Sequence, residues 1–168
     1  MKKIIALFLS VLMVMAMAAC GQEKTQETTV PAETAAPAGT EAIAAPAEDV
    51  AMNYISVEDA LAHVGEEGYT FFDVRKAEDY AAGHIPGAVG TDMDAAKEGD
   101  FAAGVATMQE ATKDLDDTLI LICYSGKRYA QATTNVLSAL GYDMSKVLTL
   151  EGGFKAWTAA YPEEIESN

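Results

Sequence analysis

The run Thr-Leu-Ile-Leu-Ile-Cys-Tyr-Ser-Gly-Lys-Arg occupies residues 118–128 and gives the clearest structural signal in the sequence. Its unbroken apolar part, Thr118–Cys123, is typical of a strand buried on both faces of a parallel sheet. Between Lys127 and Leu140 the apolar residues fall on one helical stripe, and Gly141 supplies a helix end. A buried strand followed by a short loop and a helix predicts an α/β fold, in which ligands bind where strands end.

Further segments on both sides of this run predict the same alternation of strands and helices. Ser56 is placed to cap the start of a helix, because an acidic residue follows three positions later. Strands are predicted at Tyr69–Val74 and Val147–Leu150, and Gly152 precedes a last helix. These elements lie within residues 54–168, a length typical of a single domain.

The composition limits the class of protein. Of the 168 residues, 50% are hydrophobic and 22% are charged, which excludes a disordered polymer and leaves room for one domain. Acidic side chains outnumber basic ones 26 to 11, for a net charge of −15, so we expect no nucleic-acid partner. The two cysteines, Cys20 and Cys123, exclude a disulfide-rich scaffold. The two histidines are too few for a histidine-built metal site, and we expect no metal and no other cofactor.

The N-terminus has the pattern of a secretory signal peptide. Two lysines precede an uncharged apolar run that ends at Ala19, and this run is shorter than the ~20 residues needed to cross a bilayer. The sequence Met17-Ala-Ala-Cys-Gly21 resembles a bacterial lipobox. The resemblance implies removal of residues 1–19 and a diacylglycerol thioether on Cys20. That lipid would anchor the protein outside the cytoplasm, on the cell membrane or on the outer membrane of a two-membrane cell. An uncleaved anchor and plain secretion are the alternatives.

Residues 20–53 form a tether in this interpretation. They consist mainly of Gln, Glu, Thr, Ala and Pro and contain no aromatic side chain. Such a stretch buries too little apolar area to offset the entropy of ordering it, so we expect it to be disordered. The expected organisation is a signal peptide, a lipidated Cys20 with its tether, and a folded domain at residues 54–168.

Cys123 follows the strongest predicted strand, at the edge of the sheet where ligands bind. The loop after it consists of Tyr124, Ser125, Gly126, Lys127 and Arg128. A loop that turns from strand into helix points its backbone N–H groups inward. Together with the helix dipole and the two cations, these groups form an anion site. The same positive field favours a thiolate, a nucleophile suited to attack an anionic sulfur or phosphorus donor. The alternative is a buried structural cysteine that ends a strand.

Three segments, in the same order along the chain, resemble the motifs of the rhodanese family. They read DVRKAEDYAAGHIPGA at residues 73–88, CYSGKR at residues 123–128 and LEGGFKAW at residues 150–157. The resemblance implies a single rhodanese-like domain, with a five-stranded parallel sheet flanked by helices on both faces. It also implies sulfurtransferase chemistry, in which Cys123 takes sulfane sulfur from thiosulfate or a persulfide. The partners would then be a small anionic sulfur donor and a thiol or cyanide acceptor.

The length of the active-site loop separates two kinds of relative. Related phosphatases have a Cys-x5-Arg loop, because a phosphoryl group is larger than a sulfane sulfur. Cys123 and Arg128 form the shorter Cys-x4-Arg loop, which favours sulfur transfer. The resemblance therefore makes Cys123 the catalytic residue and Tyr124–Arg128 the loop that binds substrate.

The polar residues of the first motif are expected to be structural. Arg75 can pair with Asp73 or with Glu78 where a strand meets a turn. His84 precedes Ile-Pro-Gly, a tight-turn sequence. It is the only plausible histidine base, but a thiolate that is already ionised needs none.

Two features depart from the family pattern. Tyr129 stands where a serine often follows the loop arginine. The segment Asp92–Asp117 is acidic and longer than the usual connection. If it overhung the pocket it would repel anionic donors; a solvated helix face is the interpretation that we favour.

Two functions remain open at this point. One is a membrane-tethered sulfurtransferase in which Cys123 becomes a persulfide. The other is a non-catalytic rhodanese-like module that binds a partner or carries sulfur to it, which the acidic charge and the tether would suit.

Overall fold

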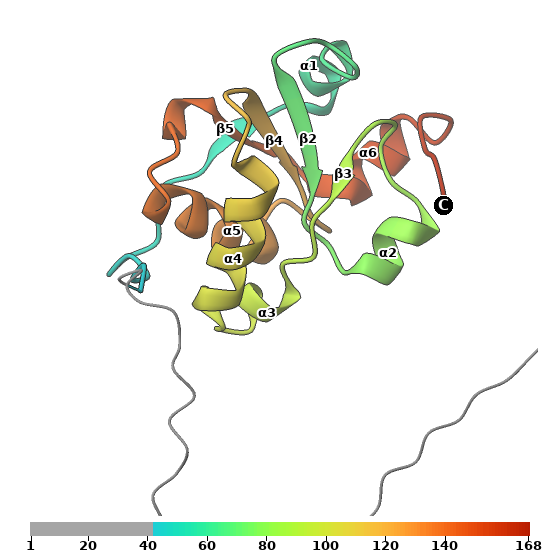
Figure 1. Cartoon of the computed structure of the whole chain (residues 1–168). Coiled ribbons are helices and arrows are strands. Elements are labelled where there is room, and N and C mark those ends of the chain that lie inside the picture. The colour runs from blue at the N-terminus through green and yellow to red at the C-terminus, as the bar shows by residue number, and fades with distance from the viewer. Residues whose placement is uncertain (1–41) are drawn as a thin grey trace, which may run out of the picture. The chain divides into compact units, whose positions relative to one another are not determined.

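The computed structural model describes residues 42–168, which fold around a five-stranded parallel sheet (Figure 1). The strands are β1 (Asn53–Ile55), β2 (Tyr69–Asp73), β3 (Val89–Gly90), β4 (Thr118–Ile122) and β5 (Val147–Leu150). The helices are α1 (Val57–Ala62), α2 (Ala77–Ala82), α3 (Asp94–Lys97), α4 (Phe101–Thr112), α5 (Arg128–Ala139) and α6 (Gly153–Ala160). The strand order is β1-β5-β4-β2-β3, and every pair runs parallel. The predicted α/β fold with a five-stranded parallel sheet is confirmed.

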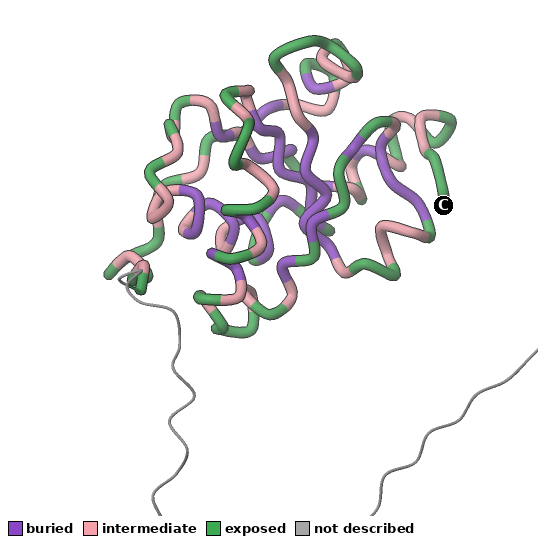
Figure 2. The backbone as a smooth tube through the Cα atoms, in the orientation of Figure 1, coloured by how far each residue is buried: buried purple, intermediate pink, exposed green. Residues whose placement is uncertain are grey.

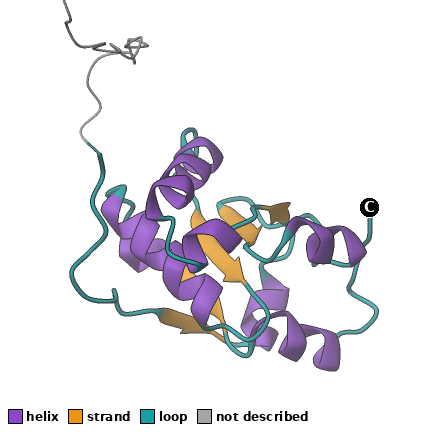
Figure 3. Cartoon of the chain, turned by 90° about the horizontal axis from the view of Figure 1, so that it is seen from below, coloured by secondary structure: helices purple, strands orange, loops and turns teal. Residues whose placement is uncertain are grey.

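Helices cover both faces of the sheet, and each face has its own apolar core (Figure 2, Figure 3). Along β4, Leu119 and Leu121 belong to the core that residues of α4 and α5 complete. Ile120 and Ile122 belong to the other core, together with residues of α1 and α6. All four side chains are fully buried. Burial of each Leu or Ile contributes ~1.5–3 kcal/mol, so β4 is central to both cores, as its unbroken apolar run predicts.

Local predictions are confirmed by single hydrogen bonds. The Oγ of Ser56 accepts a hydrogen bond from Asp59 N at 3.0 Å and caps α1. Just after α5, Gly141 has a φ of 80°, and its N–H donates to Ser138 O at 3.0 Å. The left-handed backbone that ends this helix is one that glycine adopts without strain.

The helices α3 and α4 lie in the acidic segment, for which the sequence predicts only a solvated helical face. The structure packs them closely, because α4 carries Gly104 where it meets α3. A Cβ at Gly104 would lie 2.6 Å from Ala96 Cβ, closer than real Cβ atoms approach, and a tight 3.1 Å from Val136 Cγ2. This glycine lets α3 pack closely against α4, and α3 also contacts α5.

The folded region begins before Tyr54, which corrects the boundary expected from the sequence. Val50 N–H donates to Asn135 Oδ1 at 2.9 Å, and Gln131 Nε2 donates to Val50 O at 2.8 Å, both partners being on α5. Met52 packs against the core. We call residues 49–53 the docked segment. A stretch without aromatic residues can bind through its main chain, and composition does not show this.

The signal peptide, Cys20 and the first part of the predicted tether lie outside the described residues. Within residues 42–168, no helix has both the length and the apolar character needed to cross a bilayer.

We expect the docked segment to stabilise the domain. A protein that begins at Ala42 keeps the contacts with α5, whereas one that begins at Tyr54 loses them and the pairing of Asn53 with Leu148. Since each net hydrogen bond contributes ~0.5–1.5 kcal/mol, the shorter protein should melt roughly 5–15 °C lower. Thermal unfolding followed by circular dichroism measures the difference.

A matched pair of substitutions on α5 sharpens this test. Asn135→Ala removes the acceptor of Val50 N–H and the donor to Asp49 Oδ1, and should lower the melting temperature by a few degrees. Ser138→Ala is the control, because the side chain of Ser138 makes no hydrogen bond within residues 42–168. The docked segment would contribute nothing to stability if Asn135→Ala and Ser138→Ala had the same melting temperature, and if the proteins that begin at Ala42 and at Tyr54 did so too.

Candidate active site

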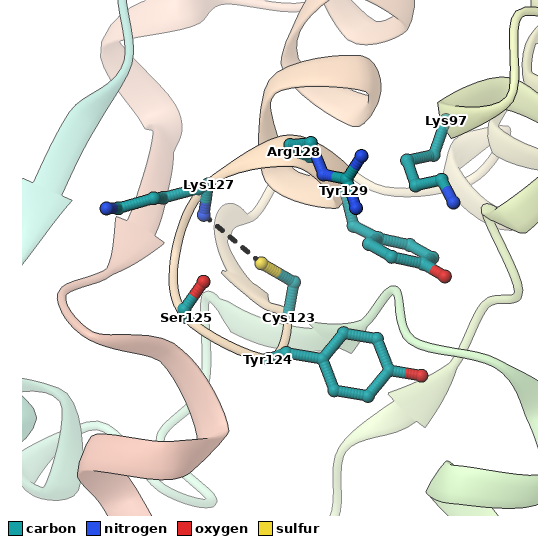
Figure 4. Close-up of a pocket in the computed structure, with 7 residues that line it drawn as sticks. All are labelled: Lys97, Cys123, Tyr124, Ser125, Lys127, Arg128 and Tyr129. Atoms are coloured by element: carbon teal, nitrogen blue, oxygen red, sulfur yellow. Dashed lines mark hydrogen bonds between the residues drawn. The ribbon is translucent and has the colours of Figure 1, made fainter.

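Cys123 directly follows β4, at the carboxyl end of this central strand, where the chain turns into α5 (Figure 4). The residue is almost enclosed, with 2% of its surface exposed. Its Sγ accepts a hydrogen bond from Lys127 N at 3.3 Å. A backbone N–H aimed at the sulfur, at the N-terminal end of a twelve-residue helix, favours negative charge on that atom. The geometry therefore suits a thiolate nucleophile.

The turn between β5 and α6 holds this loop in place. Phe154 N–H donates to Cys123 O at 2.7 Å. Gly153, with a φ of 62°, lies so close that a Cβ there would be 2.3 Å from Cys123 O. Gly126 is confined in the same way, since its Cβ would be 2.6 Å from Leu150 O. Two glycines thus allow two backbones to approach more closely than any side chain would permit.

A pocket of about 480 Å³ opens beside Cys123. Its lining residues are Lys97, Cys123, Tyr124, Ser125, Lys127, Arg128 and Tyr129 (Figure 4). Every residue of the predicted substrate loop except Gly126 is among them. Among residues 42–168, three cations line the pocket and no carboxylate does, although the whole chain carries a net charge of −15. The local charge therefore suits an anionic ligand.

The cations of the pocket lie on different sides of the sulfur. Figure 4 shows the Lys127 side chain extending away from Cys123, whereas Arg128 and Lys97 lie on the side of the Tyr129 ring. Lys127 therefore contacts the sulfur through its backbone N–H and not through its side-chain ammonium. Arg128 and Lys97 are the cations that a ligand beside the tyrosine rings would meet.

Lys97 is the site residue that the sequence analysis missed. It comes from α3, in the acidic segment, and its side chain is only 10% exposed. Its Nζ lies 3.5 Å from Asp94 Oδ1 and 5.1 Å from the centroid of the Tyr129 ring, and it also pairs with Glu98. The hydrogen bond with Glu98 raises the pKa of Lys97, so the ammonium stays charged. In the sequence, a lysine among carboxylates looks the same whether it lines a pocket or forms an ion pair at the surface.

Two tyrosine rings form the aromatic wall of the pocket. Tyr124 and Tyr129 meet edge to face, with ring centroids 5.2 Å apart. Tyr129 OH donates to Asp94 Oδ1 at 2.6 Å, and Tyr124 OH donates to Asp79. Burial, with the help of these carboxylate partners, raises the pKa of Tyr124 to about 12 and raises that of Tyr129 further. Both hydroxyls therefore stay protonated at neutral pH, and the wall carries no negative charge.

Arg75 of the first sequence motif contacts α6 and does not line the pocket. Arg75 Nη2 donates to Asp73 Oδ2 and to Gly83 O, both at 2.6 Å, and its guanidinium lies 3.7 Å from the centroid of the Phe154 ring. Of the two partners that the sequence allowed for Arg75, the structure therefore selects Asp73. Glu78 is exposed, in the first turn of α2, and forms no ion pair within the described residues.

His84 is not among the pocket residues. It is 5% exposed, and its ring stacks on Tyr80 with centroids 4.0 Å apart. Its Nδ1 lies 3.0 Å from Tyr80 O, and its backbone pairs with that of Glu166. These contacts hold a turn together, and His84 does not line the pocket beside Cys123.

The family model described as "Rhodanese-like domain" matches residues 56–160. The chain belongs to the rhodanese-like family. The family predicted from the three motifs is thus confirmed.

Two similar proteins bear the name thiosulfate sulfurtransferase GlpE. The one from Pseudoalteromonas translucida is 32% identical over 117 residues, which cover 70% of this chain and 99% of the relative. The one from Pseudomonas entomophila is 36% identical over 110 residues, covering 66% of this chain and 88% of the relative. These relatives support a rhodanese-type sulfurtransferase.

Solved structures agree with the fold. The BH2092 protein from Bacillus halodurans superposes with a TM-score of 0.54 at 25% identity, covering 68% of this chain and 77% of that one. A rhodanese-like domain from Anabaena superposes with a TM-score of 0.53 at 19% identity, covering 70% and 81%. The second likeness shows the fold alone.

Gly153→Ala should disrupt the active-site loop of the rhodanese domain. The new Cβ would meet Cys123 O at 2.3 Å and Ser125 N at 2.7 Å, so the loop or α6 must move. We expect a fall in melting temperature of several degrees and a loss of sulfur transfer of at least roughly tenfold, the equivalent of about 1.4 kcal/mol in the transition state.

Gly65→Ala is the matched control for this glycine. Gly65 has a φ of 73°, close to that of Gly153, but nothing lies within 4 Å of its Cβ position. It should show the backbone strain of ~1–2 kcal/mol without the loss of activity. Equal activity of both variants would mean that the loop does not depend on the close approach of Gly153.

Proposed function

We propose that this rhodanese domain is an extracytoplasmic sulfurtransferase, held on a membrane by a lipid on Cys20. Sulfane sulfur passes from thiosulfate or a persulfide donor to Cys123, and from Cys123 to a thiol or cyanide. The observation that carries the proposal is the enclosed Cys123 Sγ, which accepts Lys127 N–H in a pocket lined by cations and by no carboxylate.

Loading begins with attack of the Cys123 thiolate on the outer sulfur of thiosulfate. A sulfur–sulfur bond forms to Sγ, and the sulfur–sulfur bond of thiosulfate breaks. Its electron pair leaves with sulfite, so Cys-S⁻ and S₂O₃²⁻ become Cys-S-S⁻ and SO₃²⁻. The Lys127 N–H, at the N-terminal end of α5, stabilises the negative charge on sulfur before and after this step.

Discharge returns the enzyme to its first state. Cyanide attacks the outer sulfur of the persulfide, the bond between the two sulfurs breaks, and its electron pair returns to Sγ. Cys-S-S⁻ and CN⁻ thus become Cys-S⁻ and SCN⁻. A thiolate acceptor follows the same course and leaves as its own persulfide. No step requires a general base, which agrees with the position of His84 outside the pocket.

Cys123→Ser tests the enzymatic proposal. With thiosulfate and cyanide, the unmodified protein should form thiocyanate, and the serine variant should form none, because an alcohol is not ionised at neutral pH. Incubation with thiosulfate alone should yield a species about 32 Da heavier, with the added sulfur on Cys123. Colorimetric thiocyanate detection and intact mass spectrometry make the two measurements.

The non-catalytic module gives the opposite result. A protein that folds normally, forms no thiocyanate and gains no mass from thiosulfate or from a persulfide donor would be a binding module with a rhodanese fold. Mass gain without turnover would instead identify a sulfur carrier. In either case the enzymatic proposal would be abandoned.

Cys20→Ala tests the proposed anchor. In cells, the unmodified protein should sediment with membranes, whereas Cys20→Ala should appear in the soluble extracytoplasmic fraction. Two or three acyl chains give firm attachment at ~0.8 kcal/mol per buried CH₂, and the acidic domain adds no attraction to anionic lipid. Cys123→Ser is the control that stays on the membrane. Intact mass shows whether Cys20→Ala still carries residues 1–19, whose apolar run could hold it on the membrane. Membrane attachment of Cys20→Ala that has lost these residues would exclude the lipid as the anchor.

A further inference from the structure

The pocket is larger than thiosulfate or cyanide requires. An ion of five heavy atoms fills no more than roughly 150 Å³, at the ~30 Å³ that a water molecule occupies. The pocket holds about 480 Å³, which lies in the range of pockets that bind organic molecules. The volume left beside the reacting sulfur is bounded by the aromatic wall of Tyr124 and Tyr129 and by Lys97.

The aromatic wall is fixed and uncharged. The hydroxyls of Tyr124 and Tyr129 are engaged by Asp79 and Asp94, so the rings are held at both ends. Ring surface of this kind packs against the carbon chain of a ligand. Thiosulfate and cyanide have no such chain, and neither would use the wall.

A cation lies beyond this wall. Lys97 Nζ is 5.1 Å from the centroid of the Tyr129 ring, and Arg128 lies on the same side in Figure 4. Lys97 Nζ lies 3.5 Å from Asp94 Oδ1, which also accepts the hydrogen bond of Tyr129 OH. Its second carboxylate partner is Glu98, whose side chain is 67% exposed. An ion pair with so exposed a partner contributes little, so Glu98 can be exchanged for a ligand carboxylate. Along the pocket, the nucleophile Cys123 is thus followed by the aromatic wall and then by the Lys97 cation.

From this order of groups we infer that the pocket takes a small organic thiol that carries a carboxylate, as the acceptor of sulfur from the Cys123 persulfide. The carbon chain lies against Tyr124 and Tyr129, and the carboxylate pairs with Lys97. The thiolate attacks the outer sulfur of the persulfide, and the sulfur–sulfur bond breaks toward Cys123. Cys-S-S⁻ and RS⁻ thus become Cys-S⁻ and RS-S⁻. Lys97 is a specificity-determining residue in this step, and the inference rests on the proposed sulfurtransferase function.

Two acceptors of equal length separate the contribution of the carboxylate: 3-mercaptopropionate and its amide, 3-mercaptopropionamide. With thiosulfate as donor, kcat/KM for the acid should exceed that for the amide by roughly three- to tenfold in the unmodified protein. Lys97→Met should bring the ratio close to one, and Lys97→Arg should restore most of it. The same two thiols react with every variant, so their intrinsic reactivities cancel in the comparison.

Two control variants make the comparison specific. Lys113→Met removes another lysine that pairs with a nearby glutamate, Glu110, outside the pocket, and should leave the ratio unchanged. Glu98→Gln frees Lys97 from its competitor and should raise the ratio. The melting temperature of each variant shows whether the fold is kept, and the charge-preserving Lys97→Arg keeps the test decisive if Lys97→Met unfolds.

The cyanide assay separates failure of the proposed function from failure of the inferred acceptor class. If no thiocyanate forms with thiosulfate or with a persulfide donor, the proposed function itself is wrong. If thiocyanate forms but acid and amide react equally, or if neither thiol reacts, the inferred acceptor class is wrong. A protein thiol would then be the next candidate. A ratio that persists in Lys97→Met would assign the carboxylate to another cation and overturn the role of Lys97.

Discussion

One contact between two backbones determines the geometry of the site. Gly153 lies against the carbonyl of Cys123 with no space for a side-chain carbon, and Phe154 N–H closes the contact at 2.7 Å. The carbonyl of Cys123 is thus held by α6, and farther along the loop the Lys127 N–H donates to Sγ. The main chain thus positions the nucleophile. The side chains of the loop remain available for substrate.

The charge of the chain and the charge of its pocket have opposite signs. The net charge is −15, yet the residues that line the pocket include three cations and no carboxylate. Salt screens interactions between exposed charges beyond roughly 8–10 Å, so distant surface carboxylates act weakly on Cys123. Groups within the pocket act at short range and in a less polar medium. An acidic protein can therefore bind anionic donors, provided that its carboxylates face away from the nucleophile.

The sequence predicts what depends on local pattern and misses what depends on packing. The apolar run of β4, the cap at Ser56 and the end of α5 at Gly141 each follow from neighbours along the chain, and all three are present. Lys97 could not be found in this way, because its place in the pocket depends on the packing of α3 against α4 at Gly104. The docked segment was missed for a related reason. It binds α5 through the backbone of Val50, and every residue except proline has the same backbone donor and acceptor.

The two departures from the family pattern, which the sequence presents as unrelated, meet in the structure. Tyr129 replaces a small residue after the loop arginine, and its hydroxyl reaches Asp94 at the start of α3. A serine at this position is too short to span that distance, and Asp94 would lose the hydrogen bond that does most to lower its pKa. Lys97 would lose the ring beside which its ammonium lies. The tyrosine therefore connects α3 to the helix that follows the nucleophile, and it gives the Lys97 ammonium an aromatic ring to lie beside at the pocket.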